Sequence, residues 1–211
     1  ECAILRLGDI GLNGDSVAVF EDDLIGVFGG IPGELVEADI YRYKRKKKHF
    51  ISGMVVRVIE RSEHRISAPC PYFGPCSGCQ WQHIDYRFQL QLKQQLVEIS
   101  LKSYENLSNV RVSSTVPSPD QLGYRNHARF TVRFGGQLGF SNRITRQFIR
   151  IQKCKIMTPV INDVLLELQD RCGETTNLSV RVGISTGDKL IQPALKSSLI
   201  PVVTGQKWYL E

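Results

Sequence analysis

The stretch Val36-Glu37-Ala38-Asp39-Ile40-Tyr41 indicates the fold of the first part of this chain. Val36, Ala38 and Ile40 alternate with the intervening residues, so the period is two, and a strand with this period has one face in a core and one toward solvent. Further short apolar runs, punctuated by glycine and an acidic turn, surround this stretch within residues 1–60. Several short strands in so small a segment predict a small closed β barrel, an architecture without exposed sheet edges.

A basic run follows this strand. Its cations place six positive charges within seven residues, in a chain whose net charge is +6: Arg42, Lys44, Arg45, Lys46, Lys47 and Lys48. We expect the run at a connection between two strands on the barrel rim. Tyr41, Tyr43 and Phe50 lie among these cations, and the combination suits single-stranded RNA, whose bases stack and whose phosphates are negative. The alternative is a solvated loop whose aromatic residues pack in the barrel.

The remainder of the chain predicts a mixed α+β region. Residues 85–101 have helical periodicity with Asp85 as the N-cap, and Thr158 followed by Pro159 begins a second predicted helix. Two antiparallel hairpins are expected, one turning at Gly135-Gly136 and one near residues 186–188. The expected apolar faces of the two helices are, in order, Phe88, Leu92, Leu96, Ile99 and Ile161, Val164, Leu165, Leu168. Residues 113–121 are expected to form a loop or linker.

Composition places the chain among globular proteins. Of its 211 residues, 42% are hydrophobic and 23% are charged, which suits one sizeable domain or two smaller ones. No apolar run approaches the roughly 20 residues that a membrane-spanning helix needs, and the amino end lacks a secretory pattern. We therefore expect a cytoplasmic protein without a membrane partner.

The cysteines predict a metal site. Cys70, Cys76 and Cys79 form a C-x5-C-x2-C arrangement in a loop rich in proline and glycine, and Cys154 is the best candidate for a fourth ligand. The flanking Lys153 and Lys155 would favour its thiolate. Disulphides are the main rival, and a cytosolic setting argues against them. Three clustered ligands with a distant fourth favour an iron–sulphur cube over zinc, although the spacing leaves both open.

Two further cysteines have a simpler interpretation. Cys2 and Cys172 are expected to be small buried apolar residues, as free cysteines commonly are. Cys172 lies near a predicted helix end without a neighbouring histidine in sequence, so we do not interpret it as a nucleophile.

The cysteine segment, Ala68-Pro69-Cys70-Pro71-Tyr72-Phe73-Gly74-Pro75-Cys76-Ser77-Gly78-Cys79-Gln80-Trp81-Gln82-His83, resembles the iron–sulphur signature of the RNA uracil-5-methyltransferases. Residues 1–60 resemble their TRAM domain, a small five-stranded, OB-like RNA-binding barrel. Gly123-Tyr124-Arg125-Asn126-His127-Ala128-Arg129, Leu138-Gly139-Phe140 and Cys154-Lys155-Ile156 resemble the central domain in order and spacing. Ser77 departs from the glycine of many members but removes no ligand.

This resemblance implies a mainly β fold with α+β: a TRAM barrel over residues 1–60 and a central iron–sulphur and RNA-recognition domain over residues 61–211. It implies that Cys70, Cys76, Cys79 and Cys154 hold a 4Fe-4S cluster. The family transfers a methyl group from S-adenosylmethionine to C5 of uracil. We identify no catalytic residue and no S-adenosylmethionine-binding residue in this chain, so the catalytic methyltransferase domain is expected to be absent and the chain inactive alone.

RNA is the expected partner, ribosomal RNA of the 23S type first and transfer RNA as the alternative, with no DNA. Besides the basic run from Lys44 to Lys48, Arg125, Arg129 and Arg133 are candidate RNA ligands on one face of a strand, against the alternative of cross-strand salt bridges. A different reading of the whole chain is a stand-alone iron–sulphur or zinc module that binds RNA or senses redox state without enzymatic activity. An electron-transfer protein ranks last, because the sequence suggests no electron partner.

Overall fold

The computed structural model describes residues 1–45, 47–196 and 208–210, and the chain divides into two compact units. The first unit comprises Glu1–Pro69 and Cys79–Pro117, and the second comprises Cys70–Gly78 and Ser118–Glu211. The division between these units differs from the expected boundary at residue 60. The reason is tertiary packing: the long helix that follows the cysteine loop packs with Ile10 and Ile31 from the connections between strands of the first unit.

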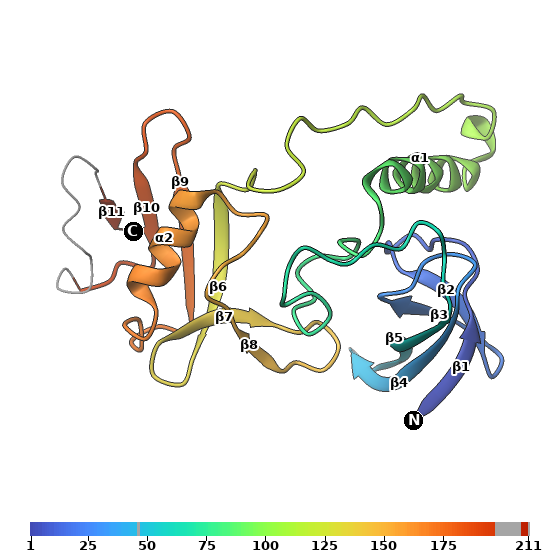
Figure 1. Cartoon of the computed structure of the whole chain (residues 1–211), viewed down its shortest axis with the longest axis horizontal. Coiled ribbons are helices and arrows are strands. Elements are labelled where there is room, and N and C mark those ends of the chain that lie inside the picture. The colour runs from blue at the N-terminus through green and yellow to red at the C-terminus, as the bar shows by residue number, and fades with distance from the viewer. Residues whose placement is uncertain (46, 197–207, 211) are drawn as a thin grey trace. The chain divides into compact units, whose positions relative to one another are not determined.

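Five strands form the sheet of the first unit, in the order β1-β4-β5-β3-β2. The sheet curls into a half-barrel, as Figure 1 shows, which agrees with the predicted barrel-like architecture. The order begins with β1 and ends with β2, so within the described residues no ladder between these two closes the barrel as expected. The strands are β1 (Cys2–Arg6), β2 (Ser16–Phe20), β3 (Asp23–Phe28), β4 (Leu35–Arg45) and β5 (Lys48–Glu60).

The alternating stretch is part of β4 and behaves as predicted. The side chains of Val36, Ala38 and Ile40 are buried, and the residues between them are only partly covered. β4 pairs with β1 on one side and with β5 on the other, antiparallel in both cases, whereas β3 and β5 are parallel. The inward residues of β4 therefore form the centre of the barrel core, together with Leu5, Leu7, Ala18, Ile25 and Val27.

Helix α1 (Tyr86–Lys102) belongs to the first unit. Its N-cap is Asp85, as predicted, and the carboxylate of Asp85 accepts a hydrogen bond from the backbone N–H of Phe88 at 3.0 Å. Leu92 is buried with Ile10, Ile31 and Ile84, and Phe88 and Leu96 pack against this cluster. Ile99 was expected on the same face but is 36% exposed, because the last turns of α1 extend beyond the cluster. A short 3-10 turn, η1 (Glu105–Leu107), follows.

The second unit is an α+β structure around a six-stranded sheet of order β11-β10-β9-β6-β7-β8 (Figure 1). Both predicted hairpins are confirmed, since β6 pairs with β7 and β9 with β10, antiparallel in each case. The elements are β6 (His127–Arg133), β7 (Gln137–Ser141), β8 (Phe148–Arg150), α2 (Pro159–Leu168), β9 (Asn177–Val182), β10 (Lys189–Gln192) and β11 (Trp208–Leu210).

Helix α2 covers one face of this sheet. Its predicted apolar face is confirmed: Ile161, Val164, Leu165 and Leu168 have no exposed surface and pack with the inward residues of β6 and β9. The opposite face of β6 and β9 presents polar side chains to solvent. Neither α1 nor α2 has the length and apolar character that crossing a bilayer requires, and no other helix in the described residues has them.

Candidate nucleic-acid interface and cysteine loop

The basic run forms the tip of the β4–β5 hairpin, at a strand-to-strand connection as expected. Lys44 pairs with His49 across the hairpin, and Lys47 has a positive φ of 64°, the left-handed conformation that closes a tight turn. Lys46 and the side chain of Arg45 lie outside the described residues. The structure therefore shows the side chains of Lys44, Lys47 and Lys48 from this run, and all three are exposed.

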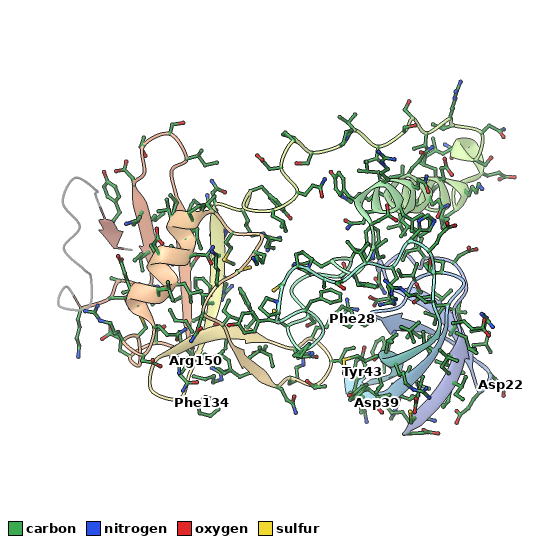
Figure 2. The ribbon with its side chains drawn as sticks, in the orientation of Figure 1. Asp22, Phe28, Asp39, Tyr43, Phe134 and Arg150 are labelled. Carbon is green, nitrogen blue, oxygen red and sulfur yellow. The ribbon has the colours of Figure 1, made fainter. Side chains whose placement is uncertain are left out.

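An aromatic pair stands directly below these cations. Tyr43 and Phe50 are cross-strand partners whose rings stack at 5.6 Å with 15° between their planes. Tyr43 is 43% exposed and Phe50 is 39% exposed, so neither ring is buried in the barrel core. Tyr43 is labelled in Figure 2, near the end of the sheet. Tyr41, further down β4, is only partly exposed.

The base and the tip of the hairpin differ in whether their cations are paired with carboxylates. Arg42 is held by Glu21 at 2.8 Å and by Glu1 at 3.3 Å, so its charge is offset within the barrel. Among the described residues, neither Lys44, Lys47 nor Lys48 takes part in a salt bridge. Exposed cations without carboxylate partners remain available to a polyanion.

Only two of the three predicted arginines of the second unit lie on the same strand face. Arg129 and Arg133 share the exposed face of β6, whereas Arg125 precedes the strand and its backbone bonds to Ile156 and Thr158. In the described part of the chain none of the three forms a salt bridge, contrary to the cross-strand alternative. Arg150 on β8, labelled in Figure 2, is different, because it binds Asp170 at 2.6 Å.

Sequence reasoning missed a hollow of about 620 Å³ on this exposed face. Residues of β6, β9 and β10, with Pro193, line it: His127, Arg129, Asn177, Ser179, Arg181, Leu190, Gln192 and Pro193. The alternation of the polar Ser179 and Arg181 with apolar residues in β9 was the sequence signal that could have revealed this polar face. Partial burial, followed by the nearby charges of Arg181 and Arg125, lowers the pKa of His127, so this imidazole lies in a positive field.

The cysteine loop is fixed to the second unit by three hydrogen bonds outside the cysteines. The Tyr72 hydroxyl accepts from the backbone N–H of Gln152 at 3.1 Å, and the Asn142 amide donates to the Pro75 carbonyl at 2.8 Å. The hydroxyl of Ser77, the residue that departs from the family pattern, accepts from the backbone N–H of Arg143 at 2.6 Å. The loop therefore lies on the same unit as Cys154.

A buried amide holds Cys154. The side-chain oxygen of Asn162, on α2, accepts from the backbone N–H of Cys154 at 2.7 Å, and its nitrogen donates to the Cys154 carbonyl at 3.1 Å. The same nitrogen also lies 3.3 Å from the carbonyls of Met157 and Thr158. Cys154 and Tyr72 both pack against the apolar core of the second unit.

None of the four candidate ligands is in a disulphide. Cys70, Cys76, Cys79 and Cys154 are all partly exposed and none forms a disulphide, so the rival reading of structural disulphides is not what the structure has. Cys79 begins the segment assigned to the first unit, and the other three belong to the second. Within the described residues no three ligands come close enough to hold a single metal ion.

The two remaining cysteines differ in their burial. Cys172 is buried as predicted, and burial raises the pKa of its thiol to about 11, which makes it a poor nucleophile. The prediction for Cys2 was wrong. Cys2 is exposed on the edge strand β1, where its sulphur donates to Glu37 at 3.4 Å, because only the opposite face of β1 reaches the barrel core.

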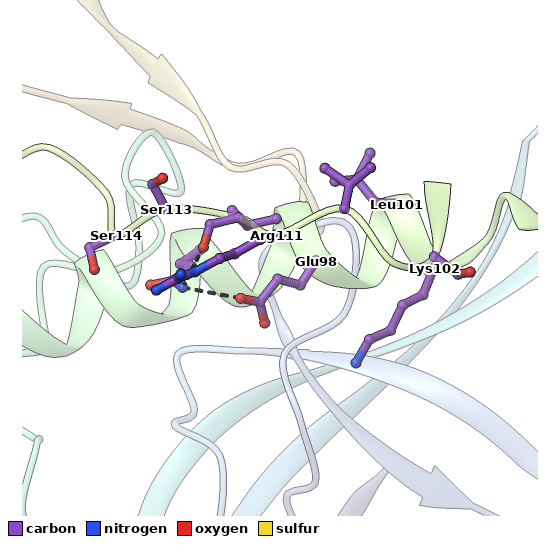
Figure 3. Close-up of a pocket in the computed structure, with 10 residues that line it drawn as sticks. Glu98, Leu101, Lys102, Arg111, Ser113 and Ser114 are labelled. Carbon is purple, nitrogen blue, oxygen red and sulfur yellow. Dashed lines mark hydrogen bonds between the residues drawn. The ribbon is translucent and has the colours of Figure 1, made fainter. Parts of the chain in front are cut away.

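A second hollow, of about 600 Å³, lies between α1 and the segment that runs back along it (Figure 3). Gln94 bridges the two, donating to Glu98 at 3.1 Å and to the Val112 carbonyl at 3.2 Å. Glu98, Lys102 and Arg111 line the hollow, so charges of both signs meet there. This arrangement fits the attachment of the segment to the helix better than the binding of a charged ligand.

A buried ion pair supports the first unit. The carboxylate of Glu34 has no exposed surface and binds Arg65 at 2.5 Å, while the backbone N–H groups of Ile31 and Ser62 also donate to it. Burial opposes ionisation of Glu34, but these hydrogen bonds outweigh it and hold its pKa below the ordinary value. Burial lowers the pKa of the neighbouring His83 to about 4.

Comparisons with known proteins agree on one class. The chain is 28% identical to an uncharacterized RNA methyltransferase of Gloeobacter violaceus over 84% of its length, and 27% identical to one of Nostoc over 99%. It is 35% identical, over 75% of its length, to the 23S rRNA (uracil(1939)-C(5))-methyltransferase RlmD of Cupriavidus necator. These matches cover 42%, 48% and 35% of the relatives, so the chain spans less than half of each. No family profile matches the chain.

Proposed function

Because this chain belongs to the RNA uracil-5-methyltransferase family, we propose that it is the RNA-binding part of an enzyme that methylates C5 of a uracil in RNA. The observation that carries this proposal is similarity to RNA methyltransferases over 75–99% of the chain. The 23S rRNA relative favours ribosomal over transfer RNA. The relatives are methyltransferases more than twice as long as the matched segment, which speaks against a stand-alone module.

In this proposal the β4–β5 hairpin is the first RNA contact. Lys44, Lys47 and Lys48 neutralise phosphates, and the exposed Tyr43–Phe50 stack offers a ring face to an unpaired base. Methyl transfer to C5 needs a base that has left its stack, so a module that holds unpaired RNA suits the reaction. S-adenosylmethionine and the reacting groups belong to the remainder of the enzyme.

The test is RNA affinity measured against salt. Wild-type protein should bind a fluorescent 23S rRNA fragment containing the uridine that RlmD modifies, with an affinity that falls as KCl rises. Lys48→Gln should weaken binding roughly threefold and reduce the salt slope by about 0.7–0.9. Arg57→Gln is the matched control, because Arg57 lies on the same strand with its charge offset by Glu37. Equal behaviour of the two variants, or stronger binding of transfer RNA, would count against the proposal as stated.

We also propose that Cys70, Cys76, Cys79 and Cys154 hold a 4Fe-4S cluster. Four partly exposed thiols, none of them in a disulphide, supply the donors that such a cluster takes. The arrangement in sequence, three clustered ligands with a distant fourth, favours a cube over the paired knuckles typical of zinc. When bound, the cluster would act as a structural clamp that ties residues 70–79 to Cys154.

Protein purified without oxygen should contain about four irons and four sulphides per chain, as a four-iron cube requires. Cys154→Ser should lose them, and Cys172→Ser, which alters a buried cysteine that is not a proposed ligand, should keep them. Stoichiometric zinc without sulphide would replace the cluster with a zinc site and leave the RNA proposal standing.

A further inference from the structure

The hollow on the exposed face of β6, β9 and β10 contains an arrangement of cations that the fold does not explain. Arg129 on β6 stands opposite Ser179 on β9, and His127 stands opposite Arg181. Directly paired residues and residues two apart share one face of a sheet, so all four side chains rise from the same surface. Arg129 and Arg181 are diagonal neighbours, a spacing of about 7–8 Å between their strand positions.

Among the described residues, nothing acidic lines this hollow. Its lining consists of two arginines, a histidine, two amides, a hydroxyl and the apolar Leu190 and Pro193. Neither Arg129 nor Arg181 takes part in a salt bridge within the described residues, whereas Arg6, Arg42 and Arg150 on other strands each bind a carboxylate. Like charges on neighbouring positions of a sheet are unfavourable, so an anion placed between them would relieve the repulsion.

The polar partners fit a particular kind of anion. The His127 ring lies 2.9 Å from the Ser179 hydroxyl, so the direct strand partners of Arg181 and Arg129 form a hydrogen-bonding pair on the same face. Gln192 is the β10 partner of Ser179, Asn177 lies two residues from Ser179 along β9, and both add amides, while Leu190 adds an apolar surface opposite Arg181. Guanidinium groups donate hydrogen bonds to phosphate oxygens. Amides can hydrogen-bond to the edge of a base, and an apolar surface can pack against its face.

We infer that this face binds a single-stranded RNA segment, with Arg129 and Arg181 on one phosphodiester and the amides of Asn177 and Gln192 beside the adjoining nucleotide. The inference rests on the proposed RNA-binding function and extends it from the β4–β5 hairpin to the second unit. It adds Arg181 to the residues that read RNA, a residue that none of the sequence patterns singled out.

The probe is a fluorescent uridine decamer, titrated into the protein at several KCl concentrations. Arg181→Gln should weaken binding roughly fivefold and reduce the salt slope by about 0.7, the value for one phosphate contact on a single strand. Arg150→Gln should leave both unchanged, because Arg150 is an exposed arginine of the same unit that is already paired with Asp170. Arg181→Gln behaving as Arg150→Gln does would overturn the inference.

A second measurement locates the bound probe independently of its affinity. A phosphate bound between Arg129 and Arg181 would offset the positive field that, after burial, lowers the pKa of His127, so the decamer should raise that pKa. NMR titration of the ring protons follows it, with His127→Gln assigning the signal among the four histidines. An unchanged His127 pKa in saturated protein overturns the inference even if affinity falls in Arg181→Gln.

The outcomes separate this inference from the proposal on which it rests. If Lys48→Gln weakens binding of the decamer while Arg181→Gln and the His127 signal do not respond, the hairpin function stands and the face of the second unit is not an RNA site. A wild-type protein that binds neither the decamer nor the 23S fragment overturns both.

Discussion

At the scale of single residues, the most unusual chemistry lies beneath the barrel, at Glu34, Arg65 and His83. The Glu34 carboxylate is fully buried and takes hydrogen bonds from Arg65 and from two backbone N–H groups. His83 is 3% exposed, and its ring nitrogen lies 3.4 Å from the carbonyl of Gly30. A buried imidazole beside a partly buried guanidinium is held neutral, because both desolvation and the charge of Arg65 oppose its protonation.

Acid should therefore destabilise the first unit through His83. The unfolded chain protonates this imidazole below its ordinary value of 6.5, whereas the folded protein does so only near pH 4. The stabilisation is complete above pH 6.5 and is lost as the pH falls toward 4. Between about pH 7.5 and about pH 5, wild-type protein should lose about 2 kcal/mol of unfolding free energy through this group.

Urea unfolding at both pH values, for wild type and His83→Gln, measures this loss. The variant is expected to be less stable at neutral pH but to depend less on pH. His49→Gln, which alters an exposed histidine on the hairpin, should retain the wild-type dependence. A His83→Gln curve parallel to that of wild type would place the acid sensitivity elsewhere.

At the scale of elements, helix α2 does more than cover a sheet. Thr158 and Pro159 begin it, as the sequence predicts, and its apolar face fills the core of the second unit. Its polar Asn162 is 6% exposed and is directed at the backbone of the turn that carries Cys154. The helix thus fixes the one proposed cluster ligand that is distant in sequence from the cysteine loop.

Removing this amide should loosen the proposed cluster. In Asn162→Ala the backbone N–H of Cys154 loses its acceptor and the thiol loses its fixed position. We expect iron to leave the protein about tenfold faster in the presence of a chelator, in line with losses seen when groups behind a metal ligand are removed. Release is followed by the decay of the visible absorption band of the cluster.

The neighbouring Asp163→Ala is the control, because Asp163 lies on the exposed side of the same helix. Thermal unfolding of both metal-free variants shows how much of the effect is general destabilisation. If Asn162→Ala releases iron at the rate of Asp163→Ala, Asn162 supports the fold and has no part in holding the ligand.

At the scale of the whole molecule, the chain path joins the two units in an unexpected way. The chain leaves the first unit at Pro69, contributes Cys70–Gly78 to the second and returns to the first at Cys79. It passes to the second unit again only after Pro117. The exposed, irregular stretch over residues 113–121, predicted as a linker, is thus one of several crossings.

Cleavage within this stretch should not separate the fragments. The amino-terminal fragment keeps Tyr72 and Ser77, whose hydroxyls accept hydrogen bonds from Gln152 and Arg143 of the carboxyl-terminal fragment. Limited subtilisin digestion followed by size-exclusion chromatography should give two fragments in one peak under native conditions. The Tyr72→Phe variant should dissociate more readily, and fragments that elute separately in wild type would contradict the packing of this loop.

Much of the architecture could be read from local patterns. The period-two alternation in β4 and the start positions of α1 and α2 depend on residues within one or two turns, and the structure confirms each of them, although the Thr158 side chain makes no capping hydrogen bond. The cysteine spacing and the basic run were likewise visible as clusters in sequence. Predictions that required knowledge of a partner element succeeded less often, as the exposed Cys2 and Ile99 show.

The sequence by itself determined the strands, the helix starts, the hairpin that carries the cations and the family to which the chain belongs. Only the tertiary structure decided that α1 packs with the first unit, that Asn162 holds Cys154, and that Arg129 and Arg181 rise from one face with no carboxylate partner among the described residues. The physical reason is range. Hydrogen-bonded periodicity and capping act between residues close in the chain, whereas burial and charge pairing depend on residues that folding alone brings together.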